Sequence, residues 1–195
     1  DLGSEFDICV GNDCSTDNTL EIIKKLNVKY ITNKKNLGYE ATLNNLYNYA
    51  LEHEYKFMIT MDADGQHCIN DVKLVSKLLE KNDLILTTRP FYPRLGEKFF
   101  SFISRKILNV DDLLSGLKGY RLKKTENSEN NFDFIGSKLA LEKILSRQRY
   151  VSVNITINER VDEPRYGAGL RVNIRLILHA IRMIKHIVYH KNKCQ

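Results

Sequence analysis

The stretch Phe57-Met58-Ile59-Thr60-Met61-Asp62-Ala63-Asp64-Gly65-Gln66-His67 decides how the rest of this 195-residue chain is interpreted. Its apolar first half, residues 57–61, predicts a buried strand, and two carboxylates one residue apart follow directly. A buried strand that ends in acids places charge at the edge of a sheet, where ligands bind in open α/β sheets. Asp62 and Asp64 offer hard oxygen ligands, which suit Mg²⁺ or Mn²⁺ rather than Zn²⁺. The stretch therefore predicts a divalent metal site.

Alternating strands and helices surround this stretch and predict the fold class. Strands are expected over residues 7–10 and 28–31, and a helix over 39–53 leads into the stretch. A helix over 71–81 and a strand over 83–88 follow it. Such alternation predicts an α/β fold with a mostly parallel central sheet flanked by helices. Because no linker or repeat interrupts residues 1–195, we expect one domain, which also contains a helix through Phe99 to Leu108, a helix over 135–146 and a strand over 150–157.

Composition limits the class of protein. Hydrophobic residues make up 43% of the chain and charged residues 28%, which is ordinary for a soluble globular protein. Every apolar run falls short of the ~20 residues that span a bilayer, and no signal peptide is recognisable. The cysteines form no Cys-x-x-Cys pair, so we interpret them as free thiols in a reducing compartment and expect a cytoplasmic protein, at most at the cytoplasmic face of a membrane. They are Cys9, Cys14, Cys68 and Cys194.

The net charge of +6 is concentrated at the carboxyl end. From Arg171 onward there are six basic residues and no acidic one, while the other 24 Lys and Arg residues balance 24 Asp and Glu residues. A neutral body argues against a nucleic-acid-binding protein, which usually shows a wider basic face.

Residues 171–192 predict a basic amphipathic helix. Two interpretations of its apolar stripe stay open. One is peripheral contact with a membrane surface, which suits apolar and basic faces on one helix. The other is packing on the domain or on a second subunit of a homo-oligomer. The stripe consists of Ile174, Ile177, Leu178, Ile181, Ile184 and Val188.

Two more polar segments are candidate sites. Asp13 follows the first predicted strand, where a carboxylate could accept a hydrogen bond from the imide N–H of a nucleobase. Residues 111–121 form a second candidate functional loop with two acids and a Ser-Gly turn. Asp111 and Asp112 are candidates for a general base, although capping of a turn explains them equally well. His67 is interpreted as a residue that shapes its loop rather than as a metal ligand.

Four motifs together resemble those of family 2 glycosyltransferases. They are Asn12-Asp13-Cys14-Ser15-Thr16-Asp17, Asn36-Leu37-Gly38, Asp62-Ala63-Asp64-Gly65-Gln66-His67 and Ser115-Gly116-Leu117-Lys118-Gly119-Tyr120-Arg121, in the order and rough spacing of that family. The most similar branch is that of the dolichyl- and polyprenyl-phosphate sugar synthases, whose late arginine-containing loop resembles residues 159–167. The resemblance implies a GT-A fold, transfer of a hexose from a UDP- or GDP-sugar to a polyprenyl phosphate, and a requirement for Mg²⁺ or Mn²⁺.

The resemblance also assigns roles to single residues. Asp62 and Asp64 match the motif that binds the metal and the diphosphate, and Gln66 matches a third metal ligand. Asp13 matches the acid that holds the nucleobase. Asp112 and Arg121 are the candidates for catalysis. Positions that bind the phosphates of the donor or the acceptor are matched by Arg89, Arg94, Arg121 and Arg165.

Two departures from the family pattern stand out. Cys14 occupies a position where family members usually have glycine, which could tighten the turn near the base. The first strand and helix of the family would precede Asp7 and are not recognised. The resemblance therefore implies a chain truncated at its amino terminus, with a weakened hold on the donor.

The chemistry of sugar transfer leaves the acceptor open. A divalent metal stabilises the departing diphosphate, and arginines bind phosphates by two-point contacts. A polyprenyl phosphate is already anionic and needs no base, whereas the hydroxyl of a saccharide acceptor needs one, such as Asp112. A soluble glycosyltransferase that extends a saccharide is thus the alternative. More remote alternatives are a phosphatase of the haloacid-dehalogenase type, with Asp62 as nucleophile in Asp-x-Asp-Gly, and a non-catalytic remnant.

Overall fold

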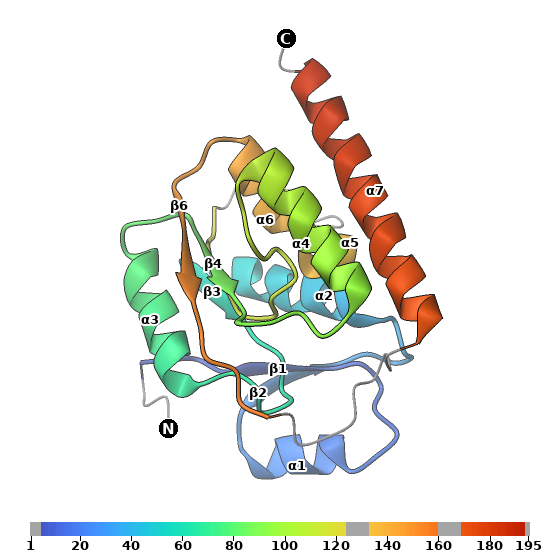
Figure 1. Ribbon diagram of the computed structural model, residues 1–195. Helices are drawn as coiled ribbons and strands as arrows, with labels where there is room; N and C mark the ends of the chain where they lie inside the picture. Colours follow the sequence, from blue (N-terminus) through green and yellow to red (C-terminus); the bar gives the residue numbers. More distant parts are fainter. Residues whose placement is uncertain (1–4, 124–132, 160–168, 194–195) are drawn as a thin grey trace.

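The computed structural model describes residues 5–123, 133–159 and 169–193 (Figure 1). Strands and helices alternate through most of the chain, as the sequence predicts. In chain order the elements are β1 (Cys9–Asn12), α1 (Thr19–Lys25), β2 (Lys29–Thr32), α2 (Tyr39–Glu52), β3 (Phe57–Thr60), α3 (Ile69–Leu79), β4 (Leu84–Thr88), α4 (Leu95–Leu108), β5 (Lys118–Arg121), α5 (Asp133–Gly136), α6 (Lys138–Leu145), β6 (Tyr150–Asn154) and α7 (Leu170–Lys193).

The strands form two sheets. The larger sheet has the order β3-β5-β4-β6, and its strands β3, β4 and β6 run in one direction while β5 runs against them. The smaller sheet pairs β1 with β2 in parallel. In both sheets the carboxyl ends of the parallel strands lead into the polar segments that the sequence singles out.

Strand β5 differs from the prediction, which treats residues 111–121 as a loop. Its sequence Lys-Gly-Tyr-Arg has no run of β-branched residues, so periodicity gives no signal for a strand. The strand conformation comes from pairing with β3 on one side and β4 on the other. Gly119 permits this arrangement, because a Cβ there would lie 2.6 Å from Cγ1 of Val75 on α3.

Helices cover both faces of the larger sheet. Helix α3 lies on one face, and α2, α4, α6 and α7 lie on the other (Figure 1). The core beneath α3 includes Val75 and Ile85. Strand β6 contributes to it, since Val151 and Val153 pack against this cluster. The larger core on the opposite face is built around buried Tyr47, Phe100 and Tyr120.

Helix α7 is present as predicted, but it packs through a different face. The side chains buried against the domain are Leu176, Ala180, Met183 and Ile187. Most of the predicted stripe points to solvent instead, and its Ile177 and Ile181 are 38% and 42% exposed. The reason is a close approach to α4, where a Cβ at Gly96 would lie 2.8 Å from Cβ of Leu176.

Two further predictions concern the membrane and the thiols. Within the described ranges, no helix combines the length and the apolar character needed to cross a bilayer. Cys9, Cys14 and Cys68 are free thiols, while Cys194 lies outside the described residues.

Candidate active site

Asp62 lies at the carboxyl edge of the larger sheet, directly after β3 and against the backbone of the Ser115-Gly116 segment. A Cβ at Gly116 would lie 2.6 Å from Cγ of Asp62, so only glycine leaves room for the carboxylate. Thr60 fixes the segment by donating a hydrogen bond to the Gly116 carbonyl at 3.0 Å. Asp62 is half-buried. Within the part of the chain that the structure describes, its carboxylate oxygens accept no hydrogen bond and form no ion pair.

The turn after Asp62 is fixed by its own backbone and by the segment that follows β6. The amide of Gln66 donates to Oδ1 of Asp64 at 3.2 Å, and Gly65 has a φ of +78° that suits glycine. The amide of Asn158 donates to the Gln66 carbonyl at 3.0 Å. His67 pairs through its backbone with Ile157.

The imidazole of His67 is half-buried near the two acids. Its Nδ1 atom has no hydrogen-bond partner among the described residues. Burial lowers the pKa of His67, although the nearby charges of Asp62 and Asp64 act in the opposite direction. A neutral imidazole with an unpaired nitrogen next to two carboxylates is the kind of group that a bound ligand would complete.

Arg89 and Asp112 form a buried ion pair next to Asp62. Nε of Arg89 donates to Oδ2 of Asp112 at 2.7 Å, and Nη2 donates to Oδ1 at 3.2 Å. The backbone amides of Leu114 and Ser115 also donate to Oδ1, at 2.9 and 3.1 Å. Asp112 is only 2% exposed, so its oxygens are held inside the protein. This geometry suits a residue that positions Arg89 and the Ser115-Gly116 turn.

Glu97 extends the pair at the first turn of α4. Its Oε2 lies 3.4 Å from Nη1 of Arg89, and its Oε1 accepts a hydrogen bond from Nη1 of Arg94 at 2.6 Å. Burial alone would lower the pKa of the Arg89 guanidinium, but Asp112 and Glu97 raise it above its ordinary value. Two arginines are therefore fixed at the carboxyl end of β4. Glu97 was not singled out from the sequence, where an acid in the first turn of a helix is unremarkable.

Lys118 is a second site residue that the sequence analysis missed. It begins β5 beside Thr60 and is 2% exposed, with its Nζ donating to the Ser115 carbonyl. Burial lowers its pKa to about 8, although Asp112 and Asp62 favour the charged form. No periodicity could reveal it, because a lysine in a polar segment is usually solvated. The antiparallel pairing of β5 carries its ammonium group inside.

Asp13 directly follows β1 of the smaller sheet and faces a different turn. Its carboxylate accepts hydrogen bonds from the amides of Leu37 and Gly38, both at 2.8 Å, and from the side chain of Asn33 at 2.9 Å. Burial opposes ionisation, but these hydrogen bonds prevail and lower the pKa of Asp13. The structure thus joins the first two sequence motifs, with Asp13 fixing the Asn36-Leu37-Gly38 turn.

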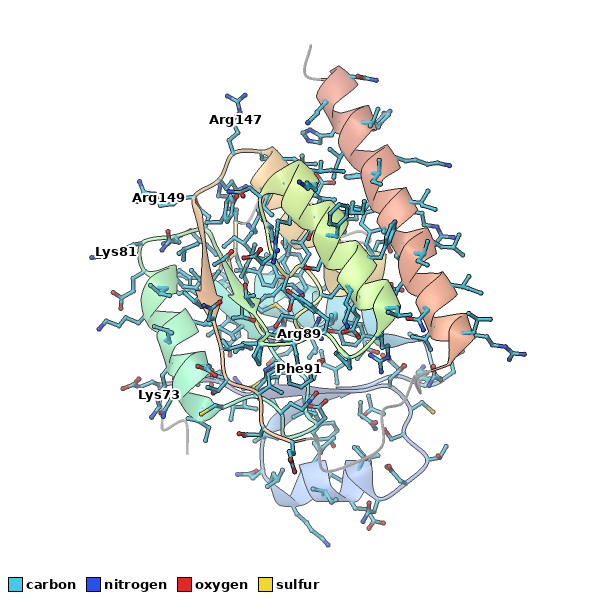
Figure 2. The ribbon with its side chains drawn as sticks, viewed as in Figure 1. Lys73, Lys81, Arg89, Phe91, Arg147 and Arg149 are labelled. Carbon is cyan, nitrogen blue, oxygen red and sulfur yellow. The ribbon has the colours of Figure 1, made fainter. Side chains whose placement is uncertain are left out.

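Arg121 is not brought to this site. In the antiparallel register it pairs with Phe57, at the opposite end of β3 from Asp62. There its Nη2 donates to the Leu79 carbonyl at 2.7 Å, and its Nε lies 3.4 Å from Oδ1 of Asp83. Figure 2 shows Lys81 and Arg149, which belong to that edge, well separated from Arg89.

Two predicted candidates remain, and the structure describes one of them, Asp111. Asp111 forms an exposed pair with Nε of Arg105 at 2.6 Å. Arg165 lies outside the described residues. The structure therefore gathers Asp62, Arg89 and Asp112 from the predicted set, adds Lys118, and places Arg121 elsewhere.

The residues at this edge fit a divalent cation bound together with a diphosphate. Within residues 5–123, 133–159 and 169–193, no group of three or more His, Cys, Asp and Glu side chains could hold a metal ion by itself. Mg²⁺, however, usually binds through one or two carboxylates plus phosphate oxygens and water. Asp62 and Asp64 supply that number, and the Asp62 carboxylate, which packs against Gly116, accepts no hydrogen bond from the described residues.

Comparison with known proteins identifies relatives. The family model described as "Glycosyl transferase family 2" matches residues 2–147. An uncharacterized protein of Methanocaldococcus jannaschii is 33% identical over 129 residues, which cover 58% of this chain and 52% of that protein. The chain thus spans about half the length of this curated relative.

Solved structures share the fold at low sequence identity. One is glucosyl-3-phosphoglycerate synthase from Mycobacterium tuberculosis in complex with Mn²⁺, UDP and glucosyl-3-phosphoglycerate, with a TM-score of 0.65, 12% identity, and coverage of 93% of this chain and 68% of that chain. A complex of the same enzyme with Mn²⁺, UDP-glucose and glycerol 3-phosphate gives 0.64 and 13%, covering 92% and 68%. These matches confirm the GT-A fold predicted from the sequence.

Proposed function

The chain belongs to glycosyl transferase family 2, and we propose that it transfers a sugar from a nucleotide-sugar donor with the help of Mg²⁺ or Mn²⁺ held by Asp62 and Asp64. The single observation that carries the proposal is the open carboxylate of Asp62, held at the sheet edge beside two fixed arginines. A metal bound there would stabilise the negative charge of the departing diphosphate. The Mn²⁺ and UDP in structures of the same fold support this assignment.

The protein's own residues would orient the donor. Arg89 is held by Asp112 and Glu97, so its guanidinium needs little reorganisation to meet a phosphate. Gln66 follows the tight turn at Asp64, where its side chain would complete the oxygen ligands. Asp13, which fixes the Leu37-Gly38 turn, would lie near the nucleobase. Either UDP or GDP would serve as the nucleotide.

For the acceptor we propose a polyprenyl phosphate. A phosphate acceptor is anionic at neutral pH and attacks without a general base. Asp112, the candidate base, accepts hydrogen bonds from Arg89 and from two backbone amides, which leaves it poorly placed to remove a proton. Arg94 lies at the start of α4, where it would meet the second anionic group.

A hydroxyl acceptor that carries a phosphate is the second candidate. Glucosyl-3-phosphoglycerate synthase, which shares the fold, is known in complex with phosphoglyceric acid together with Mn²⁺ and UDP. The arginines at the start of α4 would bind the phosphate of such a small molecule equally well.

Calorimetry with UDP and GDP, each with and without Mn²⁺, tests the donor assignment. We expect one nucleotide to bind with a strong dependence on Mn²⁺, and loss of that dependence in Asp62→Asn. Binding that is indifferent to the metal would contradict the proposal. Radiolabelled transfer to dolichyl phosphate or to 3-phosphoglycerate then separates the two acceptors.

A further inference from the structure

The exposed side of α7 is apolar where a surface helix is usually polar. Ile177, Ile181 and Val188 are 38%, 42% and 52% exposed, although the helix already buries another apolar face against the domain. The packing of α7 therefore leaves a second apolar stripe without a partner among the described residues. Scattered exposed aliphatic side chains need no explanation, but a continuous stripe on one helix does.

Helix α4 continues this stripe into a wider surface. The two helices lie side by side (Figure 1), and the Gly96 amide donates to Oδ1 of Asn173 at 2.8 Å where they begin. Phe99 follows Gly96 by three residues on α4, and Ile177 follows Asn173 by four residues on α7. Because residues three or four apart lie on the same face of a helix, Phe99 and Ile177 both lie next to the Gly96–Asn173 contact. Leu95, Phe99 and Phe102 are 73%, 40% and 56% exposed. We call the surface made by Leu95, Phe99, Phe102, Ile177, Ile181 and Val188 the α4–α7 face.

Basic side chains border the α4–α7 face. Lys106 places its Nζ 5.9 Å from the centre of the Phe102 ring, and Lys98 is exposed nearby on α4. Arg182 and Lys185 are exposed on the other border, on α7. The only acid within the two helices is Glu97, which is 4% exposed and paired with Arg89 and Arg94.

We propose that the α4–α7 face binds the surface of an anionic lipid bilayer, with both helices lying in the plane of the membrane. Apolar side chains at the centre and cations at the border match the depth profile of the interface between acyl chains and headgroups. Lysine and arginine near such a surface are attracted to anionic lipids. A second copy of the chain is a poorer occupant, because a symmetric contact would set the basic borders against each other.

This orientation would bring the membrane to the candidate active site. Helix α4 begins one residue after Arg94, and its first turn holds Glu97 between Arg94 and Arg89. A phosphate at the bilayer surface would therefore lie near these arginines. This last step rests on the proposed polyprenyl phosphate acceptor, whereas the docking of the α4–α7 face does not.

Vesicle sedimentation tests the proposal with the full chain. One set of vesicles contains phosphatidylcholine alone, and the other contains an equal mixture of phosphatidylcholine and phosphatidylglycerol. We expect binding to the mixed vesicles on the order of tenfold stronger than to phosphatidylcholine alone. Ile177→Gln combined with Ile181→Gln should weaken that binding by roughly tenfold. Arg182→Glu combined with Lys185→Glu should remove the preference for the anionic lipid.

Helix α1 supplies matched controls. Ile22 and the C-cap residue of α1, Leu26, are exposed at the same spacing of four residues, so Ile22→Gln with Leu26→Gln should leave binding unchanged. Absence of sedimentation with either vesicle, or an equal loss in the α1 control, would overturn the proposal. So would dimers that light scattering detects and that Ile177→Gln with Ile181→Gln dissociates. Because sedimentation needs neither donor nor metal, its failure is distinguishable from failure of nucleotide binding.

Discussion

Asp62 and Asp112 are two carboxylates on either side of the same Ser115-Gly116 turn, yet their environments are opposite. Asp112 is 2% exposed and accepts hydrogen bonds from the Arg89 side chain and from the amides of Leu114 and Ser115. Asp62 is half-buried, lies against Gly116, and accepts no hydrogen bond from the described residues. The carboxylate of Asp112 is filled, in the sense that protein groups donate hydrogen bonds to its oxygens. The carboxylate of Asp62 is open, because it accepts no hydrogen bond from the described residues.

This difference distinguishes a carboxylate that supports the structure from one that is available to bind a ligand. An acid whose oxygens are all engaged stabilises its surroundings and is costly to remove. An acid that accepts no hydrogen bond from the protein remains available to a ligand, and such groups are typical of functional sites. Asp13, with three hydrogen bonds, belongs with Asp112. Sequence spacing gives all three acids the same prominence.

Asp62→Asn should have the largest effect on function. The substitution keeps the shape of the side chain but removes the charge that would hold the metal, so we expect sugar transfer to fall on the order of a thousandfold. The free energy of unfolding should change by less than about 1 kcal/mol, because no protein contact is lost. Turnover assays and urea unfolding measure the two quantities. Retained turnover would show that the open carboxylate is not the metal ligand.

Asp112→Asn should have the converse profile, with its largest effect on stability. The amide cannot accept both hydrogen bonds from Arg89, and the buried guanidinium loses its counter-charge, so we expect a loss of about 3 kcal/mol in the free energy of unfolding. Asp111→Asn is the matched control, since its pair with Arg105 is exposed and should contribute less than about 1 kcal/mol. If both variants unfold at the same urea concentration, the Arg89–Asp112 pair is not the support described above.

Much of the fold was predictable from sequence, and the reasons are local. Helix α2 and strand β3 carry their own periodicity and agree with prediction to within a residue or two. Strand β5 does not, because its conformation comes from its neighbours β3 and β4. The buried face of α7 was also unpredictable, since the helix has two apolar faces and the fit of Leu176 against Gly96 selects between them.

The positions of the candidate acids in the fold were more predictable than the positions of the candidate cations. Asp62 and Asp64 follow a recognisable strand, and their position at the sheet edge agrees with the prediction. Arg121 was expected in the site because it matches a phosphate-binding position of family 2 glycosyltransferases, and residues 111–121 were expected to form one loop. The antiparallel strand moves it to the far edge and puts Lys118 in its place. The positions of Arg121 and Lys118 depend on the pairing of β5 with strands that are distant in sequence. The periodicity of a single sequence carries no information about that pairing.

Lys118 should make the stability of the chain depend on pH. Its pKa is about 8 in the folded chain against 10.5 for an exposed lysine, so between these values the unfolded chain binds more protons. Stability should therefore rise as the pH rises through this window, by about 2 kcal/mol between neutral pH and about pH 10. Urea unfolding in metal-free buffer measures it, and Lys118→Met should abolish the rise. An equal rise in both proteins would assign it to other groups.

Cys14→Gly should have the smallest effect on the free energy of unfolding, and its structural effect should be confined to the turn next to Asp13. Cys14 has a φ of +55°, a left-handed conformation that costs a residue with a Cβ roughly 1–2 kcal/mol, whereas glycine adopts it freely. Glycine loses about 0.5–1 kcal/mol of this gain through the entropy of the unfolded chain, so the net stabilisation should be about 0.5 kcal/mol. Cys68 has a φ of −82°, so Cys68→Gly recovers no strain and should destabilise the chain instead. Sugar transfer should be unchanged in Cys14→Gly, because the hydrogen bonds that hold Asp13 come from Asn33, Leu37 and Gly38 and not from Cys14. A stability loss equal to that of Cys68→Gly would mean that the Cys14 thiol, 3.9 Å from the Lys34 carbonyl, contributes more than the backbone strain costs.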